Sequence, residues 1–315
     1  MSGKIVCVGN IVHDEVFHIG LLPSAGVKTA VLDYEERFGG PAATAAVAIC
    51  RLGGTAAYWG RVGPDAARRK ALHLLAGFGV DCDGVAVLPE GRTLRAIVLV
   101  DARGERSIVS DRRGLANDPA VLPVDDLRDA AAVLADTRWA AGARVALARA
   151  RKAGIATILD ADGGTPDDNQ RLVEMADHVV FSAEGLRDHA GAGEPETLLR
   201  RCAAGTTGKV FAVTRGAAGS LWLIEEACFA VPSFPVRVRD TTGCGDVFHG
   251  AYALALSERR RPLDAALFAS AVAAIKAQRG DGWNGMADRR AVEELLATNP
   301  QLRALPHGAT TDPAP

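Results

Sequence analysis

The sequence predicts an α/β fold organised around a mainly parallel sheet. Short apolar runs rich in Val and Ile alternate with longer Ala- and Leu-rich helical patterns, and the runs are apolar almost throughout. The alternation is typical of βα units, and continuous apolar character is expected of strands covered on both faces. The expected strands are Ile5–Val8, Val133–Ala135, Thr157–Leu159, His178–Phe181 and Val210–Val213, and the expected helices are Ala42–Leu52, Ala66–Phe78, Ala141–Lys152, Glu194–Cys202 and Leu263–Gln278.

Two regions interrupt the alternation and predict a second, smaller sheet. Both have the mixed polarity of extended chain, and in the second of them Leu94–Val100 and Glu105–Ser110 flank the turn Asp101–Gly104, as in a β-hairpin. A small sheet at the edge of an α/β domain is suited to act as a lid. We therefore assign residues 1–13, 39–91 and 111–305 to an α/β core, residues 14–38 and 92–110 to a β-lid, and the polar, Pro-containing residues 306–315 to a disordered tail.

The composition excludes several functional classes. The 315 residues include 36 basic and 38 acidic ones, and no Lys/Arg-rich block marks a nucleic-acid-binding surface. The start of the chain lacks a signal-peptide pattern, and no apolar stretch is long enough for a bilayer, so no membrane contact is expected. The six cysteines form no C-x-x-C pair, which favours reduced, mostly buried thiols in a cytoplasmic protein over a zinc or redox motif.

The strongest chemical signal is the segment Asp240–Gly250, which reads DTTGCGDVFHG. Gly243 and Gly245 permit a tight turn with inward-pointing amides, and the Ala-rich residues that follow predict a helix. A turn at a helix N-terminus attracts anions through its unpaired amides and the helix dipole. The amides of Gly243, Cys244, Gly245 and Asp246 therefore predict a site for the oxygens of a transferring phosphoryl group.

Asp246, in the first turn of that helix, is the candidate catalytic base. Its carboxylate is placed to accept the proton of an attacking hydroxyl. The alternative is an ordinary helix-capping acid, which a G-x-G-D string alone would favour. The chain contains no G-x-x-x-x-G-K-[ST], and Val8-Gly9-Asn10 is not followed by G-x-G-x-x-G, so neither a P-loop enzyme nor a Rossmann dehydrogenase is indicated.

A second glycine pair precedes an expected helix. Gly39 and Gly40 come directly before the Ala-rich segment Pro41–Ala48. Glycine lets a backbone approach a ligand closely at a helix start, so we assign both glycines to substrate contact. For the alanines we prefer the alternative, which is a helix packed tightly against the sheet.

Together these segments resemble the two signatures of the ribokinase-like (PfkB) carbohydrate kinase family. Asp240–Phe248 is similar to D-T-T-G-A-G-D-x-F with Cys244 in place of Ala, and Gly39–Gly53 is similar to the N-terminal signature with Thr44 in place of Asn. Further matches cover nearly the whole chain. The resemblance implies a three-layer α/β/α core with a β-lid, an ATP-dependent sugar kinase that uses Mg²⁺, and a homodimer; it leaves open a monovalent cation as a further cofactor. It also implies an active site at the carboxyl ends of the strands.

The resemblance implies roles for further residues. Asp14 stands where the family binds sugar hydroxyls, and Thr44 still offers a hydroxyl to the sugar. Val213–Ser220 resembles the family's nucleotide-binding strand and turn, and Ala277–Gly285 fits the loop that flanks adenine. The nucleotide contacts that we name are Thr214, Gly216, Gly219, Thr242 and Gly280.

One departure from the family concerns Mg²⁺. The N-x-x-E motif should follow the strand that ends at Phe181, but this chain reads Ser182-Ala183-Glu184-Gly185, with neither residue in register. Glu184 is displaced by one residue. Asp160 and Asp162, at the end of the preceding strand, are the other acids that would organise Mg²⁺ through water. The alternative is that these two acids only cap a turn.

Within the family, the likeness is greatest to sulfofructose kinases, followed by ketohexokinase-like members. Shared strings include LAD-T-RW at Leu134–Trp139 and DVFHGA at Asp246–Ala251. Arg138 at a strand end and Lys28 in the lid are candidates to hold an anionic sugar, and Ser110 stands where those kinases have Asn. The alternatives are a structural ion pair for Arg138 and an ordinary surface position for Lys28.

The predicted function is therefore transfer of the ATP γ-phosphoryl group to a hydroxyl of a small carbohydrate, with an acidic ketose such as sulfofructose as the favoured substrate. A neutral ketohexose or ribose kinase and a nucleoside kinase of the same fold are the alternatives; the few aromatic residues of the lid count against the latter. A non-catalytic sugar or nucleotide sensor is a further alternative, against which the intact glycine turn and Asp246 count.

Overall fold

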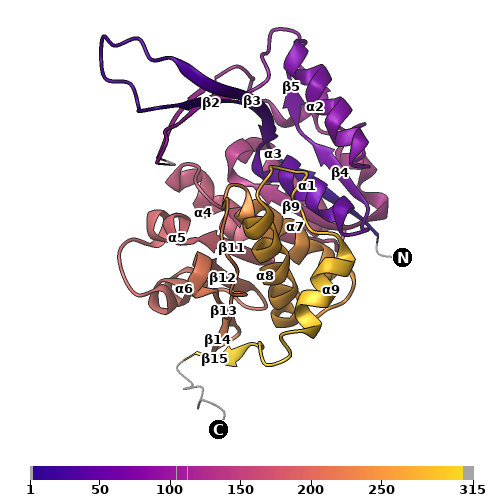
Figure 1. Ribbon diagram of the computed structural model, residues 1–315. Helices are drawn as coiled ribbons and strands as arrows, with labels where there is room; N and C mark the ends of the chain where they lie inside the picture. Colours follow the sequence, from indigo (N-terminus) through magenta and orange to yellow (C-terminus); the bar gives the residue numbers. More distant parts are fainter. Residues whose placement is uncertain (1–2, 104, 112, 308–315) are drawn as a thin grey trace.

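The computed structural model describes residues 3–103, 105–111 and 113–307 and consists of one large sheet between two layers of helices, with a smaller sheet beside them (Figure 1). The strand order of the large sheet is β15-β14-β13-β12-β11-β10-β9-β1-β4. The strands are β1 (Lys4–Val8), β4 (Ala56–Trp59), β9 (Ala130–Asp136), β10 (Ala156–Ala161), β11 (His178–Ser182), β12 (Val210–Thr214), β13 (Ser220–Ile224), β14 (Ala227–Val231) and β15 (Leu305–Pro306).

In the large sheet, the neighbouring strands β4, β1, β9, β10, β11 and β12 are parallel, as the sequence predicts. All the expected strands are present. The remaining strands, β13 to β15, extend one edge in antiparallel pairing. The short turn η4 (Gly216–Ala218) joins β12 to β13. Because a connection this short leaves no room for a crossover, the strand after it pairs antiparallel.

Helices cover both faces of the large sheet, and the two faces have separate apolar cores. Along β1, Ile5 and Cys7 point into one core and Val6 and Val8 into the other. Burial on both faces explains why the strands are apolar throughout. One layer contains α1 (Pro41–Arg51), α2 (Ala66–Gly77), α7 (Cys244–Ser257), α8 (Pro262–Arg279) and α9 (Arg289–Ala297), and the other contains α3 (Ala140–Lys152), α4 (Pro166–Met175), α5 (Ala183–Ala190) and α6 (Pro195–Ala203).

Helices α1 and α7 lie in close contact because both carry small residues where they meet. A Cβ atom added to Gly250 of α7 would lie 2.5 Å from the carbonyl oxygen of Ala45 in α1. At the start of α7, a Cβ added to Gly243 would lie 3.5 Å from Cγ2 of Thr44. The packing therefore brings the two helix N-termini, each preceded by a glycine in the sequence, to the same place.

The second sheet has the strand order β3-β2-β7-β8 (Figure 1). It contains the expected hairpin, although Gly104 in the turn lies outside the described residues. Asp14 is paired with Ala96, and Ala96 with Ser110, so Asp14 and Ser110 share one face of this sheet. The strands are β2 (Val12–Ile19), β3 (Val31–Gly39), β7 (Arg95–Val100) and β8 (Arg106–Asp111), and a separate short pair is formed by β5 (Arg61–Val62) and β6 (Ala86–Val87).

The tail and the cysteines differ in detail from expectation. Pro306 pairs with Phe229, and the amide of His307 donates to the carbonyl oxygen of Cys228 at 2.8 Å, while residues 308–315 lie outside the described residues. All six cysteines are free, as expected, but only Cys7 and Cys228 are buried.

Within the described part of the chain, no helix has both the length and the apolar character needed to span a membrane.

The contact between α1 and α7 can be tested by adding one methyl group. We expect Gly250→Ala to lower the free energy of unfolding by about 1–3 kcal/mol, because the new Cβ forces the two helices apart. Gly77→Ala, in the last turn of α2, is the matched control, since a Cβ there meets no atom within 4 Å. Denaturant unfolding followed by circular dichroism measures both changes. Equal stability of Gly250→Ala and the wild type would contradict the close contact.

Candidate active site

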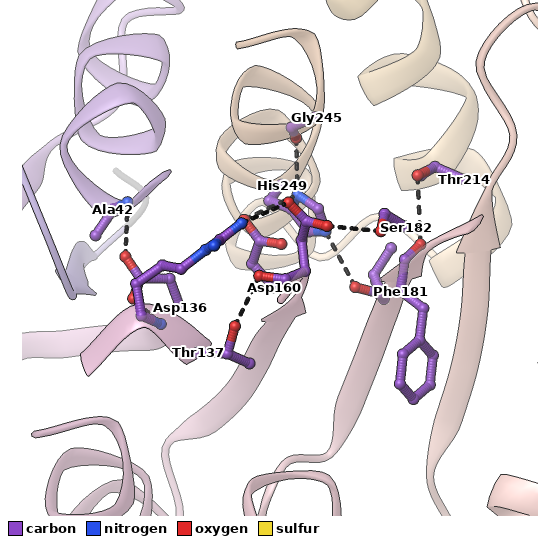
Figure 2. A network of polar contacts seen from close by, with 12 residues as sticks. Ala42, Asp136, Thr137, Asp160, Phe181, Ser182, Thr214, Gly245 and His249 are labelled. Atoms are coloured by element: carbon purple, nitrogen blue, oxygen red, sulfur yellow. Dashed lines mark hydrogen bonds and ion pairs between the residues drawn. The ribbon is translucent and has the colours of Figure 1, made fainter. Parts of the chain in front are cut away.

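A carboxylate at the carboxyl edge of the sheet joins three separate segments of the chain (Figure 2). Asp136, the last residue of β9, is 2% exposed. Its Oδ2 accepts hydrogen bonds from the amides of Asn10 at 3.0 Å and Ala42 at 3.3 Å, and its Oδ1 accepts from those of Arg138 at 2.8 Å and Trp139 at 3.3 Å. Burial raises the pKa of Asp136, while the amide hydrogen bonds oppose the rise. The end of β1, the start of α1 and the turn after β9 are thereby held together.

Two glycines make room for this junction. Gly9 has a φ of 157°, and a Cβ there would lie 1.9 Å from Oδ2 of Asp136. Gly40, the residue before α1, has a φ of 97°, and a Cβ there would lie 2.4 Å from the carbonyl oxygen of Asn10. The close approach predicted for Gly40 is therefore made to the protein's own backbone. This contact is by itself enough to require glycine at position 40.

The glycine turn before α7 has the predicted form, but its two glycines differ. Gly243 is the left-handed residue, with a φ of 74°, and caps the helix. The amide of Cys244 donates to the carbonyl oxygen of Thr241 at 3.1 Å, so this amide, unlike our expectation, is used within the turn. Gly245 is helical, and a Cβ there would meet no atom within 4 Å. Gly245 therefore adjoins space that the described residues leave open, where a ligand fits.

Asp246 is half-buried in the first turn of α7. Burial is the main cause that raises its pKa to about 7, and the negative charges of Asp160, Asp136 and Asp162 act in the same direction. His249, one turn further along the helix, acts in the opposite direction. A carboxyl group with a pKa near neutral is well matched to proton exchange with a substrate hydroxyl.

His249 connects α7 to the sheet beside Asp246. Its Nδ1 lies 2.7 Å from the carbonyl oxygen of Gly245, and its Nε2 lies 3.2 Å from that of Val180 (Figure 2). Oδ2 of Asp160, at the end of β10, lies 3.5 Å from Nδ1. Oδ1 of Asp160 is buried and has no hydrogen-bond partner among the residues that the structure describes. Burial, aided by the charge of Asp162, raises the pKa of Asp160 well above its usual value.

The three acids suggested for Mg²⁺ do not converge on one point. Asp160 faces His249, and Glu184 is exposed in the first turn of α5. Asp162 accepts a hydrogen bond from Oγ of Ser182 at 2.7 Å and forms an ion pair with Arg138 at 3.2 Å. In the described chain these acids do not form a group of ligand atoms within 4.8 Å of one another. A cage in which all three bind one ion directly is therefore not present.

Part of the expected sugar site is assembled. A Cβ added to Gly39 would lie 2.9 Å from Oδ2 of Asp14, so these two residues are neighbours. Burial raises the pKa of Asp14 to about 6, and the charge of Arg37 opposes this rise. Thr44 is buried beside the glycine turn, and its hydroxyl accepts a hydrogen bond from the indole of Trp283 at 3.0 Å. The Thr44 hydroxyl therefore already has a partner within the protein.

The residues suggested for a sugar anion are less closely associated. Lys28 is exposed in the loop between β2 and β3, which projects away from the large sheet in Figure 1. Ser110 is exposed on β8. Arg138, in the turn after β9, has its guanidinium paired with Asp162. The structural ion pair that the sequence left open for Arg138 is thus present.

Three of the residues suggested for the nucleotide lie at the end of β12 and in the turn that follows it. Thr214 ends β12, and its Oγ1 donates to the carbonyl oxygen of Phe181 at 3.3 Å (Figure 2). Gly216 and Gly219 form the β12–β13 turn with φ values of 56° and 74°. A Cβ on Gly219 would lie 2.2 Å from the carbonyl oxygen of Val231, so glycine is required there for the backbone.

A cavity of about 540 Å³ lies at the end of α8. Gly280 lines it, and so does Asp240, whose Oδ1 accepts hydrogen bonds from the amide and the hydroxyl of Thr242 at 2.9 and 2.7 Å. Of the suggested nucleotide residues, Gly280 lines the cavity and Thr242 contacts its wall. Three arginines that sequence reasoning missed also line it, namely Arg37, Arg239 and Arg279.

Sequence reasoning also missed Asp136, His249 and Trp283. Asp136 ends an apolar strand, as Asp160 nearly does, and the same signal of an acid at a strand end would have found it. His249 follows Asp246 at the spacing that places both on one helix face. Nothing in the sequence signals that Trp283 bonds to Thr44, because 239 positions separate them.

The fold and the family resemblance agree with known proteins. Residues 2–288 match the family described as pfkB family carbohydrate kinase. A putative ribokinase from Agrobacterium tumefaciens has a similar structure, with a TM-score of 0.89 and 31% identity over 96% of this chain and 99% of that one. The structure of Arabidopsis thaliana ribokinase complexed with ribose and ATP has a TM-score of 0.85 and 26% identity over 94% and 99% of the two chains. Fructokinase-1 of Oryza sativa subsp. japonica is 30% identical over an alignment of 265 positions that covers 76% of this chain and 82% of that one. The expected ribokinase-like fold is confirmed, and the chain belongs to the pfkB family of carbohydrate kinases.

Proposed function

We propose that this carbohydrate kinase transfers the γ-phosphoryl group of ATP to a hydroxyl of a neutral pentose or ketohexose, with Asp246 as the base. The observation that carries the proposal is a half-buried carboxyl group, with its pKa raised to about 7, in the first turn of a helix that begins beside open space. The Arabidopsis ribokinase complexed with ribose and ATP supports both substrates.

In the proposed mechanism the sugar lies between Asp14 and Gly39 on one side and Asp246 on the other. The sugar oxygen attacks the γ-phosphorus while the Asp246 carboxylate accepts the hydroxyl proton. The new O–P bond forms as the bond between the γ-phosphorus and the β–γ bridging oxygen breaks, and ADP leaves. The amides of Gly245 and Asp246 at the start of α7 and the positive end of the helix dipole stabilise the phosphoryl oxygens.

The acids at the carboxyl end of β10 and directly after it fit a loosely held Mg²⁺. Such an ion, carried with ATP, would neutralise charge on the phosphates. Oδ1 of Asp160 is buried and has no partner within the described part of the chain, and Asp162 is nearby and more exposed, so these two would hold the ion through water. Glu184, on the surface of α5, is the third candidate. A requirement for a monovalent cation stays a prediction, which turnover in potassium compared with tetramethylammonium salts would test.

The ion pair between Arg138 and Asp162 favours a neutral sugar. The carboxylate balances the guanidinium charge, and an anionic substrate would have to compete with it at 3.2 Å. The ribokinase and fructokinase relatives point in the same direction.

An anionic ketose such as sulfofructose is the second candidate substrate. Arg138 lies at the carboxyl edge, and 26% of its side chain is exposed, so a ligand can still reach it. Lys28 would have to move with the lid to reach the same ligand. The greater likeness to sulfofructose kinases remains a hypothesis.

We further propose that the small sheet is a lid and that two chains associate through this sheet. Apolar side chains on this sheet are unusually exposed: Leu32 by 70%, Ile108 by 61% and Val109 by 64%. Light scattering should give the mass of a dimer, and Val109→Lys should shift it toward the monomer. A monomeric wild type at micromolar concentration would contradict this proposal.

Replacement of the base tests the mechanism. Asp246→Asn should keep the fold and ATP binding but lose roughly 10²–10⁴-fold in kcat, because the amide cannot accept the proton. Steady-state kinetics and calorimetric ATP titration measure the two effects. Near-normal turnover by the folded variant would refute the role of Asp246.

The pH profile provides the control for the same role. A base acts when it is deprotonated, so kcat/KM of the wild type should fall as the pH drops below about 7. Asp160→Asn removes a negative charge that raises the pKa of Asp246, so this limb should move to lower pH. A limb that does not move in Asp160→Asn would mean that another group controls it.

The space beside Gly245 can be tested separately from stability. Gly245→Val should fold with nearly normal stability, since its Cβ meets no protein atom within 4 Å, but it should phosphorylate sugar far more slowly. Its side chain would occupy the space proposed for the phosphoryl group. Thermal unfolding and kcat are the measurements, and wild-type kcat would exclude this turn as the phosphoryl site.

The substrate class is decided by comparing sugars in wild type and Arg138→Ala. If the substrate is neutral, kcat/KM should be higher for ribose or fructose than for sulfofructose, and Arg138→Ala should affect these sugars alike. An anionic substrate would instead show a selective loss on sulfofructose of roughly 10- to 150-fold, equivalent to about 1.5–3 kcal/mol. A nucleoside in the same panel tests the remaining kinase alternative, and no turnover of any substrate would favour a sensor.

A further inference from the structure

We propose that Glu196, Cys228 and His307 form a binding site for a divalent transition-metal ion such as Zn²⁺, separate from the candidate active site. The three side chains come from α6, β14 and the residue that follows β15. They lie at the edge of the large sheet that is opposite to β1 and β4 (Figure 1). Among the described residues they form the one group of three potential ligands whose atoms all lie within 4.8 Å of one another.

The ligand types suit zinc more than the hard cations. Zinc binds cysteine sulfur, histidine nitrogen and carboxylate oxygen at about 2.0–2.3 Å, whereas Mg²⁺ and Ca²⁺ prefer oxygen ligands. Small side-chain movements would bring the three ligand atoms within this range of one ion. A thiolate and a carboxylate together would carry the two negative charges that balance a dication.

The backbone holds two of the ligands side by side. The amide of His307 donates to the carbonyl oxygen of Cys228 at 2.8 Å, and Pro306 is paired with Phe229. This pairing sets the imidazole of His307 next to the sulfur of Cys228.

Arg200 orients the third ligand. Its Nε and Nη2 donate to Oε1 of Glu196 at 3.0 and 2.7 Å, and its Nη1 donates to the carbonyl oxygen of Glu226 at 3.1 Å. Oε2 of Glu196 is therefore the oxygen directed to Nδ1 of His307, at 2.6 Å. A neighbouring group that fixes a ligand in this way is a usual feature of metal sites.

The three proposed ligands differ in their exposure to solvent. Cys228 is 9% exposed, Glu196 is partly exposed and His307 is exposed, so an ion can enter from solvent and keep a water molecule as its fourth ligand. The Cys228 thiol would release its proton to solvent on binding the cation. Without an ion, the arrangement is a hydrogen-bonded pair of His307 and Glu196 beside a thiol.

The consequence of metal binding would be attachment of the C-terminal strand. β15 contains two residues, and its pairing with β14 is correspondingly short. A metal that joins His307 to β14 and α6 would stabilise this edge, and because it binds only the folded chain it would raise the unfolding temperature.

Cobalt is the probe for the experiment, because a Co²⁺–thiolate bond gives a charge-transfer absorption band that Co²⁺ bound to oxygen or nitrogen lacks. The full chain, kept reduced and freed of metal with a chelator, is titrated with Co²⁺ in the absence of nucleotide. We expect the band to saturate at one equivalent per chain and to disappear on addition of Zn²⁺. We also expect Zn²⁺ to raise the midpoint of thermal unfolding.

Variants assign the band to the site. Cys228→Ser should abolish it, and His307→Gln, at an exposed position that should not affect folding, should weaken Co²⁺ binding by at least about tenfold. Cys202→Ser, which alters a partly buried thiol of α6, is the matched control and should retain the band. Sugar phosphorylation with Mg²⁺ and ATP should be unchanged in His307→Gln. Absence of the band in wild type, or wild-type Co²⁺ affinity in His307→Gln, would overturn the proposal.

Discussion

The hydrogen bonds of the Asp136 carboxylate are the interaction on which the candidate site depends. One buried group accepts the amides at the end of β1, at the start of α1 and in the turn after β9. The cost of burying a charge is offset because each oxygen receives two donors. Gly9 and Gly40 are required beside it, since a side chain at either position would overlap this junction.

The same edge of the sheet collects negative charge. Asp136, Asp160 and Asp162 lie at the carboxyl ends of the neighbouring parallel strands β9 and β10, and together with burial they raise the pKa of Asp246. Two of these acids have basic neighbours: Arg138 forms an ion pair with Asp162, and His249 lies beside Asp160. The field of the acids would make Asp246 a stronger base than an isolated carboxylate, while the N-terminus of α7 still favours the anionic phosphoryl group. A Mg²⁺ ion bound with ATP would offset the remaining negative charge of the acids.

Much of the fold and of the candidate site could be predicted from the pattern of residues along the chain. The strands and helices followed from apolar periodicity, and the glycine turn with Asp246 followed from two glycines before a helical run. The edge strands β13 to β15 were missed because β15 is very short and because antiparallel pairing depends on the length of a turn. The arginines of the cavity were missed because Arg37, Arg239 and Arg279 are brought together from separate parts of the chain.

The sequence by itself determined the family signatures, the α/β class and the identity of the candidate base, because these depend on local order: glycine conformation, helix start and strand periodicity. Only the tertiary structure decided which groups are partners. It paired Arg138 with Asp162, gave the Thr44 hydroxyl to Trp283, and left Gly245 beside open space. Such pairings arise when the α1–α7 contact and the parallel strands bring distant residues within hydrogen-bonding distance, and no local pattern encodes that distance.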